Sequence, residues 1–150
     1  MVTPDFVSGV LVLQLHTYIS LIMAVLICGF AMWCGDKAAR WAGAICLAAW
    51  LGSILVYRGN AYTADYGVLA IDMASLVGFV WISMRMRRIW TVIISAITAL
   101  MVASHVAVMI DLRVTLVTLV TGTAIWSYGV LACIAFGTWA GWRENRRKPA

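Results

Sequence analysis

The sequence predicts an all-α protein, a polytopic bundle of about five membrane-spanning helices. Hydrophobic residues make up 64% of the 150 residues and charged residues only 11%, and the mean hydropathy is +0.96. Soluble domains carry about 45–50% apolar and roughly 25% charged residues, and they avoid large exposed apolar patches. A chain this apolar is therefore typical of a protein whose outward faces contact lipid.

Five apolar runs are long enough to cross a bilayer. A spanning helix needs about 20 mainly apolar residues, because ~30 Å of hydrocarbon is crossed at 1.5 Å per residue. The runs cover residues 6–33, 38–57, 66–84, 89–110 and 114–142. They are apolar on every face, whereas the strands of a membrane barrel alternate apolar and polar residues. Because the charged breaks between them are short, we expect consecutive helices to be antiparallel neighbours.

Each run has a recognisable start or stop. The first lacks a basic segment before it and is longer than the core of a signal peptide, so we expect a retained span. Gly59 and Asn60 supply turn residues after the second run. Basic residues at 85–88 end the third run, and Asp111 ends the fourth. The first and last runs are long enough to tilt in the bilayer or to project from it.

The distribution of Lys and Arg predicts the orientation. Two of the eleven basic residues, Arg58 and Arg113, fall on one side of this topology. The other side holds Lys37, Arg40, Arg85, Arg87, Arg88, Arg143, Arg146, Arg147 and Lys148. Since cytoplasmic loops are enriched in basic residues, we expect the amino terminus outside and residues 143–150 as a basic cytoplasmic tail. The basic residues form short caps between apolar runs and not a stripe along one helix face, so we expect no nucleic-acid partner. We expect the protein to lie in a lipid bilayer, that of a bacterial inner membrane.

Small residues recur every four positions in the second run, at Ala44, Ala48 and Gly52, and in two longer rows in the fifth and fourth runs. One row comprises Gly129, Cys133, Gly137 and Gly141, and another comprises Ser95, Ala99, Ala103 and Ala107. In lipid, small residues let helix backbones approach closely. We therefore predict that both rows are helix-packing faces. The partner of each row is left open between a helix of this chain and a helix of another subunit.

Three ionisable residues lie inside the apolar runs: His16, Asp72 and His105. Such groups are costly in a membrane and are functional candidates by default. At 1.5 Å per residue they lie about 15, 9 and 8 Å from the outer ends of their helices. All three are therefore expected in the outer half of the bilayer, where a polar cluster is geometrically allowed.

Several roles for these residues remain open. Polar side chains commonly hold neighbouring helices together. Two histidines on antiparallel helices are also the pattern of axial haem ligation, which would make His16 and His105 ligands of haem b. A histidine–aspartate cluster suits proton or ion passage. A continuous relay would also need titratable groups in the inner half of the spans, where the sequence offers only Ser, Thr and Cys.

Catalytic and metal motifs are not evident. The chain has no GxSxG, HExxH or paired-aspartate motif, so we expect no catalytic residues and no enzyme activity. Its four cysteines lack metal-ligand spacing, so we expect no metal site. The leading hypothesis is a non-enzymatic structural or accessory subunit of a membrane oligomer or complex. A haem b electron-transfer subunit and a proton or ion transporter are the alternatives.

Overall fold

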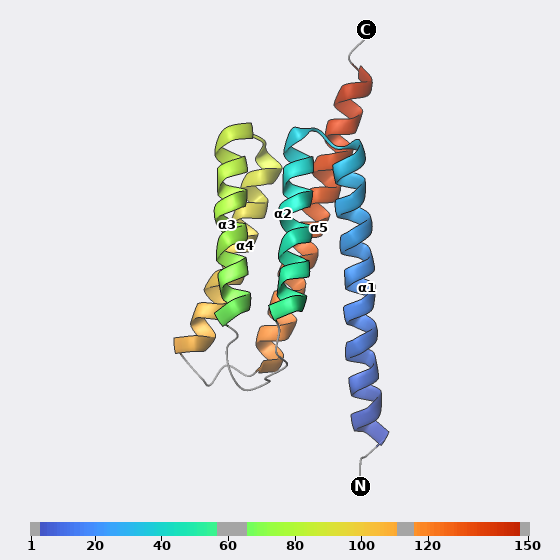
Figure 1. Cartoon of the computed structure of the whole chain (residues 1–150), viewed down its shortest axis with the longest axis vertical. Helices are drawn as coiled ribbons and strands as arrows, with labels where there is room; N and C mark the ends of the chain where they lie inside the picture. Colours follow the sequence, from blue (N-terminus) through green and yellow to red (C-terminus); the bar gives the residue numbers. More distant parts are fainter. Residues whose placement is uncertain (1–3, 57–65, 111–115, 148–150) are drawn as a thin grey trace.

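The described part of the chain forms a bundle of five helices, each antiparallel to the next one along the chain (Figure 1). The computed structural model describes residues 4–56, 66–110 and 116–147, with side chains for 18–56, 66–110, 122–144 and Arg146. Within these parts the helices are α1 (Pro4–Cys34), α2 (Lys37–Val56), α3 (Tyr66–Met86), α4 (Ile89–Ile110) and α5 (Leu116–Arg147). The described parts contain no strand. The expected all-α bundle is confirmed, and each helix begins and ends within a few residues of its predicted bounds.

Four of the helices contain segments that are long and apolar enough to cross a membrane. These segments are Lys37–Val56, Tyr66–Met86, Ile89–Ile110 and Gly122–Glu144. In α1 the part with described side chains, Tyr18–Cys34, is apolar but shorter. The chain is therefore an integral, multi-pass membrane protein. The predicted span at 6–33 coincides with α1, but the side chains of its first half lie outside the described residues.

The two ends of the bundle differ in charge. Figure 1 shows the α1–α2 connection, the α3–α4 connection and the end of α5 together at the top, while α1 begins at the bottom. We call the top the basic end, because it carries Lys37, Arg40, Arg85, Arg87, Arg88, Arg143 and Arg146. The helical topology thus gathers these basic residues on one side, as the charge distribution predicted. Arg58 and Arg113 lie outside the described residues.

Polar contacts terminate the helices at the basic end. Asp36 caps α2, because its Oδ1 accepts a hydrogen bond from the Ala39 amide at 2.9 Å. The Arg40 side chain donates to the Gly35 carbonyl at 3.1 Å. In the α3–α4 connection Arg87 has a positive φ of 49°, and its amide donates to the Ser83 carbonyl at 3.1 Å. A residue in the left-handed region is a common way to end a helix.

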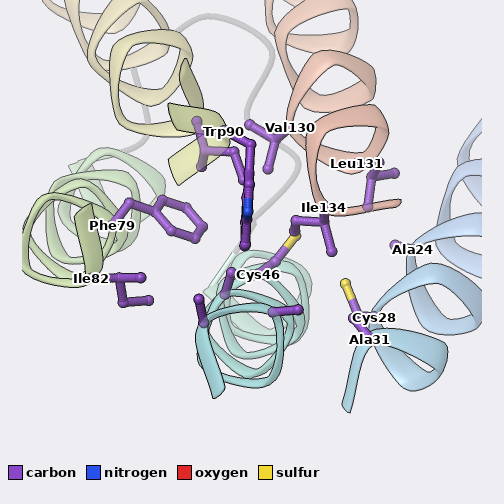
Figure 2. Close-up of a cluster of buried hydrophobic side chains, with 14 residues drawn as sticks. Ala24, Cys28, Ala31, Cys46, Phe79, Ile82, Trp90, Val130, Leu131 and Ile134 are labelled. Atoms are coloured by element: carbon purple, nitrogen blue, oxygen red, sulfur yellow. The ribbon is translucent and has the colours of Figure 1, made fainter. Parts of the chain in front are cut away.

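The core is made of large side chains on one side and small ones on the other (Figure 2). Phe79, Ile82, Trp90, Val130 and Ile134 fill the space between α2, α3, α4 and α5, while Leu131 lies on the side of α5 that faces α1. At the α1–α2 crossing the residues are small, and a Cβ on Gly43 would lie 3.1 Å from the Cys28 carbonyl oxygen. The backbones of α1 and α2 therefore pack directly against each other, as expected for helices that associate in lipid.

Helix α5 continues beyond its predicted end at residue 142. It runs to Arg147, so the first residues of the predicted basic tail are helical. The Arg143 guanidinium lies 5.3 Å from the Trp139 ring centre, and that of Arg146 lies 4.0 Å from Trp142. Contacts between residues four apart stabilise a helical turn, and an arginine over an indole adds a cation–π attraction. These pairs explain why basic residues extend the helix.

Candidate functional site: a buried histidine–aspartate pair

An ionisable pair joins α3 to α4 inside the bundle. The Nε2 atom of His105 lies 3.1 Å from Oδ2 of Asp72, and the two side chains are only 13% and 8% exposed. Asp72 lies six residues after Tyr66, where α3 begins, and His105 lies five residues before Ile110, where α4 ends. Both therefore lie in the half of the bundle away from the basic end. A buried carboxylate needs such a partner, because an unpaired charge in a membrane interior is costly.

Buried hydroxyl groups near the pair do not extend it. Ser75, one turn along α3 from Asp72, donates to the Ile71 carbonyl at 2.8 Å. Thr98, two turns along α4 from His105, donates to the Ile94 carbonyl at 2.9 Å. Each hydroxyl is thus bonded within its own helix, a common way to satisfy Ser and Thr in membrane helices. The pair is isolated among the described side chains of α3 and α4.

Buried hydroxyl groups between the pair and the basic end are likewise bonded to nearby backbone carbonyls. Thr91 donates to the Arg88 carbonyl at 2.6 Å, and Thr138 donates to the Ile134 carbonyl at 2.8 Å. Both are almost fully buried. Within the described residues, no chain of titratable side chains leads from the pair to the basic end.

The third predicted member of the cluster is placed differently. His16 lies in α1, and its side chain is outside the described residues. Helix α1 packs against α2 and α5, and these two helices lie between α1 and the α3–α4 pair (Figure 1). The structure therefore brings together Asp72 and His105. Ligation of one haem by His16 and His105 would require α1 and α4 to flank a common space, and His105 Nε2 already faces Asp72.

The two predicted packing rows face different sides of the bundle. In α5, a Cβ on Gly129 would lie 3.3 Å from Ile97 of α4, and one on Gly137 would lie 2.6 Å from the Trp90 indole. A Cβ on Gly141 would lie 3.4 Å from Asp36 in the α1–α2 connection. Within the same row, Cys133 is half-buried. The α5 row therefore faces the inside of the bundle.

The α4 row faces outward. Ala99, Ala103 and Ala107 are exposed, and Ser95 is half-buried with its hydroxyl bonded to the Thr91 carbonyl at 2.9 Å. The described helices of this chain therefore leave most of the α4 row uncovered. Spacing alone predicted both rows but does not separate an inward row from an outward one.

Three polar contacts, one between α1 and α5 and two around Arg88, were not predicted from the sequence. Ser20 in α1 and Tyr128 in α5 share a hydrogen bond between their hydroxyl oxygens of 2.6 Å. At the basic end, Arg88 lies 3.7 Å from Asp36 and 3.0 Å from Glu144, which joins the start of α4 to the α1–α2 connection and to α5. Glu144 is the lone acidic residue in the basic segment after residue 142. This isolated negative charge is the sequence feature that indicates an ion pair with a basic residue such as Arg88.

The chemistry available at this site is therefore limited to the pair itself. No group of three or more His, Cys, Asp or Glu side chains within the described residues is arranged to hold a metal ion. An imidazole N–H can donate a hydrogen bond to the carboxylate it contacts, so the pair joins a donor on α4 to an acceptor on α3. Comparison with protein-family models, with curated proteins and with solved structures finds no match.

Proposed function

We propose that this chain is a non-enzymatic structural or accessory subunit of a membrane oligomer or complex. The observation that carries the proposal is the outward row of α4, where Ala99, Ala103 and Ala107 are exposed. In lipid, helices associate through small residues because no hydrophobic effect drives them together. A row of this kind, left uncovered by the described helices of its own chain, suits the close approach of a helix from another subunit.

The contrast with α5 supports this proposal. The α5 row packs against Ile97, Trp90 and Asp36. The surface elsewhere carries many large exposed aliphatic side chains, such as Leu26, Leu55 and Val77, which suit acyl chains. We place the assembly in a bacterial inner membrane, with the basic end in the cytoplasm, because the basic residues gather at one end.

A substitution on the α4 row tests this proposal. Ala103→Leu adds bulk to an exposed position, where lipid accepts it but a closely packed helix does not. We expect wild-type protein, extracted from native membranes in a mild detergent, to elute as an oligomer or complex and the variant to shift toward the monomer. Ala132→Leu, the same change at an exposed position of α5, is the matched control and should leave the assembly unchanged. A wild-type monomer with no companion would overturn the proposal.

Proton or ion transport is a second candidate, favoured by the buried contact between His105 and Asp72. In this role the pair exchanges protons with the side of the membrane opposite the basic end. Proteoliposomes measure it directly: Asp72→Asn should abolish flux, while Ser75→Ala, which removes a neighbouring hydroxyl bonded to its own helix, should not. Equal flux in wild type and Asp72→Asn would remove the pair from any transport mechanism.

Haem b binding by His16 and His105 is tested separately, by an absorption spectrum of protein expressed with adequate haem. A Soret band that His105→Ala abolishes would support this alternative, and its absence would eliminate it.

A further inference from the structure

The last turns of α5 have two faces with different chemistry. One face meets the bundle: Gly141 packs against Asp36, and Glu144 contacts Arg88 at 3.0 Å. The opposite face points away from the other helices, because a helix turns about 100° per residue. We call it the Trp–Arg face, and it comprises the exposed residues Trp139, Trp142, Arg143 and Arg146.

The two arginines of this face are held by the two tryptophans. The Arg143 guanidinium lies 5.3 Å from the Trp139 ring centre, and the Arg146 guanidinium lies 4.0 Å from that of Trp142. A cation–π contact of this kind uses the charge of the guanidinium and consumes none of its N–H donors. Those donors match a phosphate group, which arginine can bind through two parallel hydrogen bonds.

The charge of these arginines is not balanced by the described part of the chain. At the basic end the described carboxylates that form ion pairs, Asp36 and Glu144, both pair with Arg88. Among the described residues, neither Arg143 nor Arg146 forms an ion pair with a carboxylate. Since α5 leaves the bundle at a membrane boundary, the nearest available anions there are lipid phosphates.

We propose that the Trp–Arg face of α5 binds the headgroup of an anionic phospholipid. Tryptophan favours the interface between acyl chains and headgroups, so Trp139 and Trp142 set the depth of the helix. Arg143 and Arg146 then lie at the level of the phosphate. A zwitterionic lipid such as phosphatidylcholine also carries a phosphate, but its positively charged ammonium group is repelled by the same arginines, so the face selects lipids with net negative charge.

Native mass spectrometry of the full chain in detergent, titrated with phosphatidylglycerol or phosphatidylcholine, tests this proposal. We expect tighter binding of phosphatidylglycerol. The double variant Arg143→Gln/Arg146→Gln should weaken that binding about 30-fold, since each basic residue near an anionic surface contributes about a fivefold factor. Phosphatidylcholine binding should not change. Arg113→Gln, which removes one charge outside α5, is the control and should retain the preference, and inorganic phosphate should not displace the lipid.

Two results would overturn the proposal. One is equal affinity of the wild-type protein for the two lipids. The other is an unchanged preference in the double variant. Basic residues also stabilise the carboxyl end of a helix, so the thermal midpoint of the double variant is measured without added lipid. A lower midpoint together with an unchanged lipid preference would assign Arg143 and Arg146 a structural role instead.

Discussion

Gly137 offers the sharpest test of how α5 packs on α4. A Cβ at this position would lie 2.6 Å from two carbons of the Trp90 indole and 2.9 Å from a third. Carbon atoms in contact are normally about 3.5–4.0 Å apart, so Gly137→Ala requires the ring or the helix to move by about 1 Å. Trp90 is 8% exposed and surrounded by the core, which leaves its ring little room.

The size of the effect follows from two opposing terms. Overpacking a core costs about 1–3 kcal/mol, whereas replacing glycine by alanine within a helix contributes up to about 1 kcal/mol. With the full propensity gain set against the upper part of the overpacking range, we expect Gly137→Ala to lower the free energy of unfolding by up to about 2 kcal/mol. Gly122 lies in the same helix, and a Cβ added there would meet no atom within 4 Å, so Gly122→Ala should stabilise the protein.

Thermal midpoints in one detergent, read by size-exclusion chromatography after heating, measure both variants. A change of 1 kcal/mol shifts the midpoint of a domain of this size by about 2–4 °C, so the two variants should fall on opposite sides of wild type. Trp90→Leu combined with Gly137→Ala should be less destabilising than the sum of the single changes. If Gly137→Ala is as stable as Gly122→Ala, the close packing of α5 on Trp90 is wrong.

Three further predictions concern the remaining contacts. Arg87→Gly should raise the thermal midpoint, because the positive φ of Arg87 costs about 1 kcal/mol or more for a residue with a Cβ. Arg87→Ala keeps the Cβ and should not raise the midpoint. Copper–phenanthroline should link Cys28 to Cys46, because both are buried in the core where α1 packs against α2, and a peptide map showing other pairings would contradict this packing. Tyr128→Phe should lower the free energy of unfolding by about 0.5–1.5 kcal/mol, because it removes the hydroxyl bonded to Ser20; an unchanged thermal midpoint would show that this contact contributes little.

Hydropathy predicts the helices well because the bilayer imposes a minimum apolar length on each of them. It also predicts the depth of the site. Asp72 and His105 lie at similar distances along the chain from the short α3–α4 connection, so an antiparallel pair of helices must bring them to the same level. Their estimated depths, about 9 and 8 Å, agree with the observed contact of 3.1 Å.

The rotation of each helix about its axis could not be predicted in this way. Apolar side chains face both lipid and neighbouring helices, so the hydrophobic pattern does not mark the inner face. For this reason the sequence offered equivalent packing rows in α4 and α5, although Ala103 is exposed and Gly137 is buried. The placement of α1 beside α2 and α5, which separates it from His105, likewise follows from packing geometry that residue spacing does not encode.

The contacts around Arg88 make the two ends of the bundle unequal in their response to ions. Its side chain is 44% exposed, and those of Asp36 and Glu144 are 22% and 47% exposed. Dissolved salt screens accessible charges of this kind, whereas it has little effect on a pair as enclosed as His105 and Asp72. Raising the ionic strength therefore loosens the junction of the α1–α2 connection, α4 and α5 while the opposite half of the helices keeps its register.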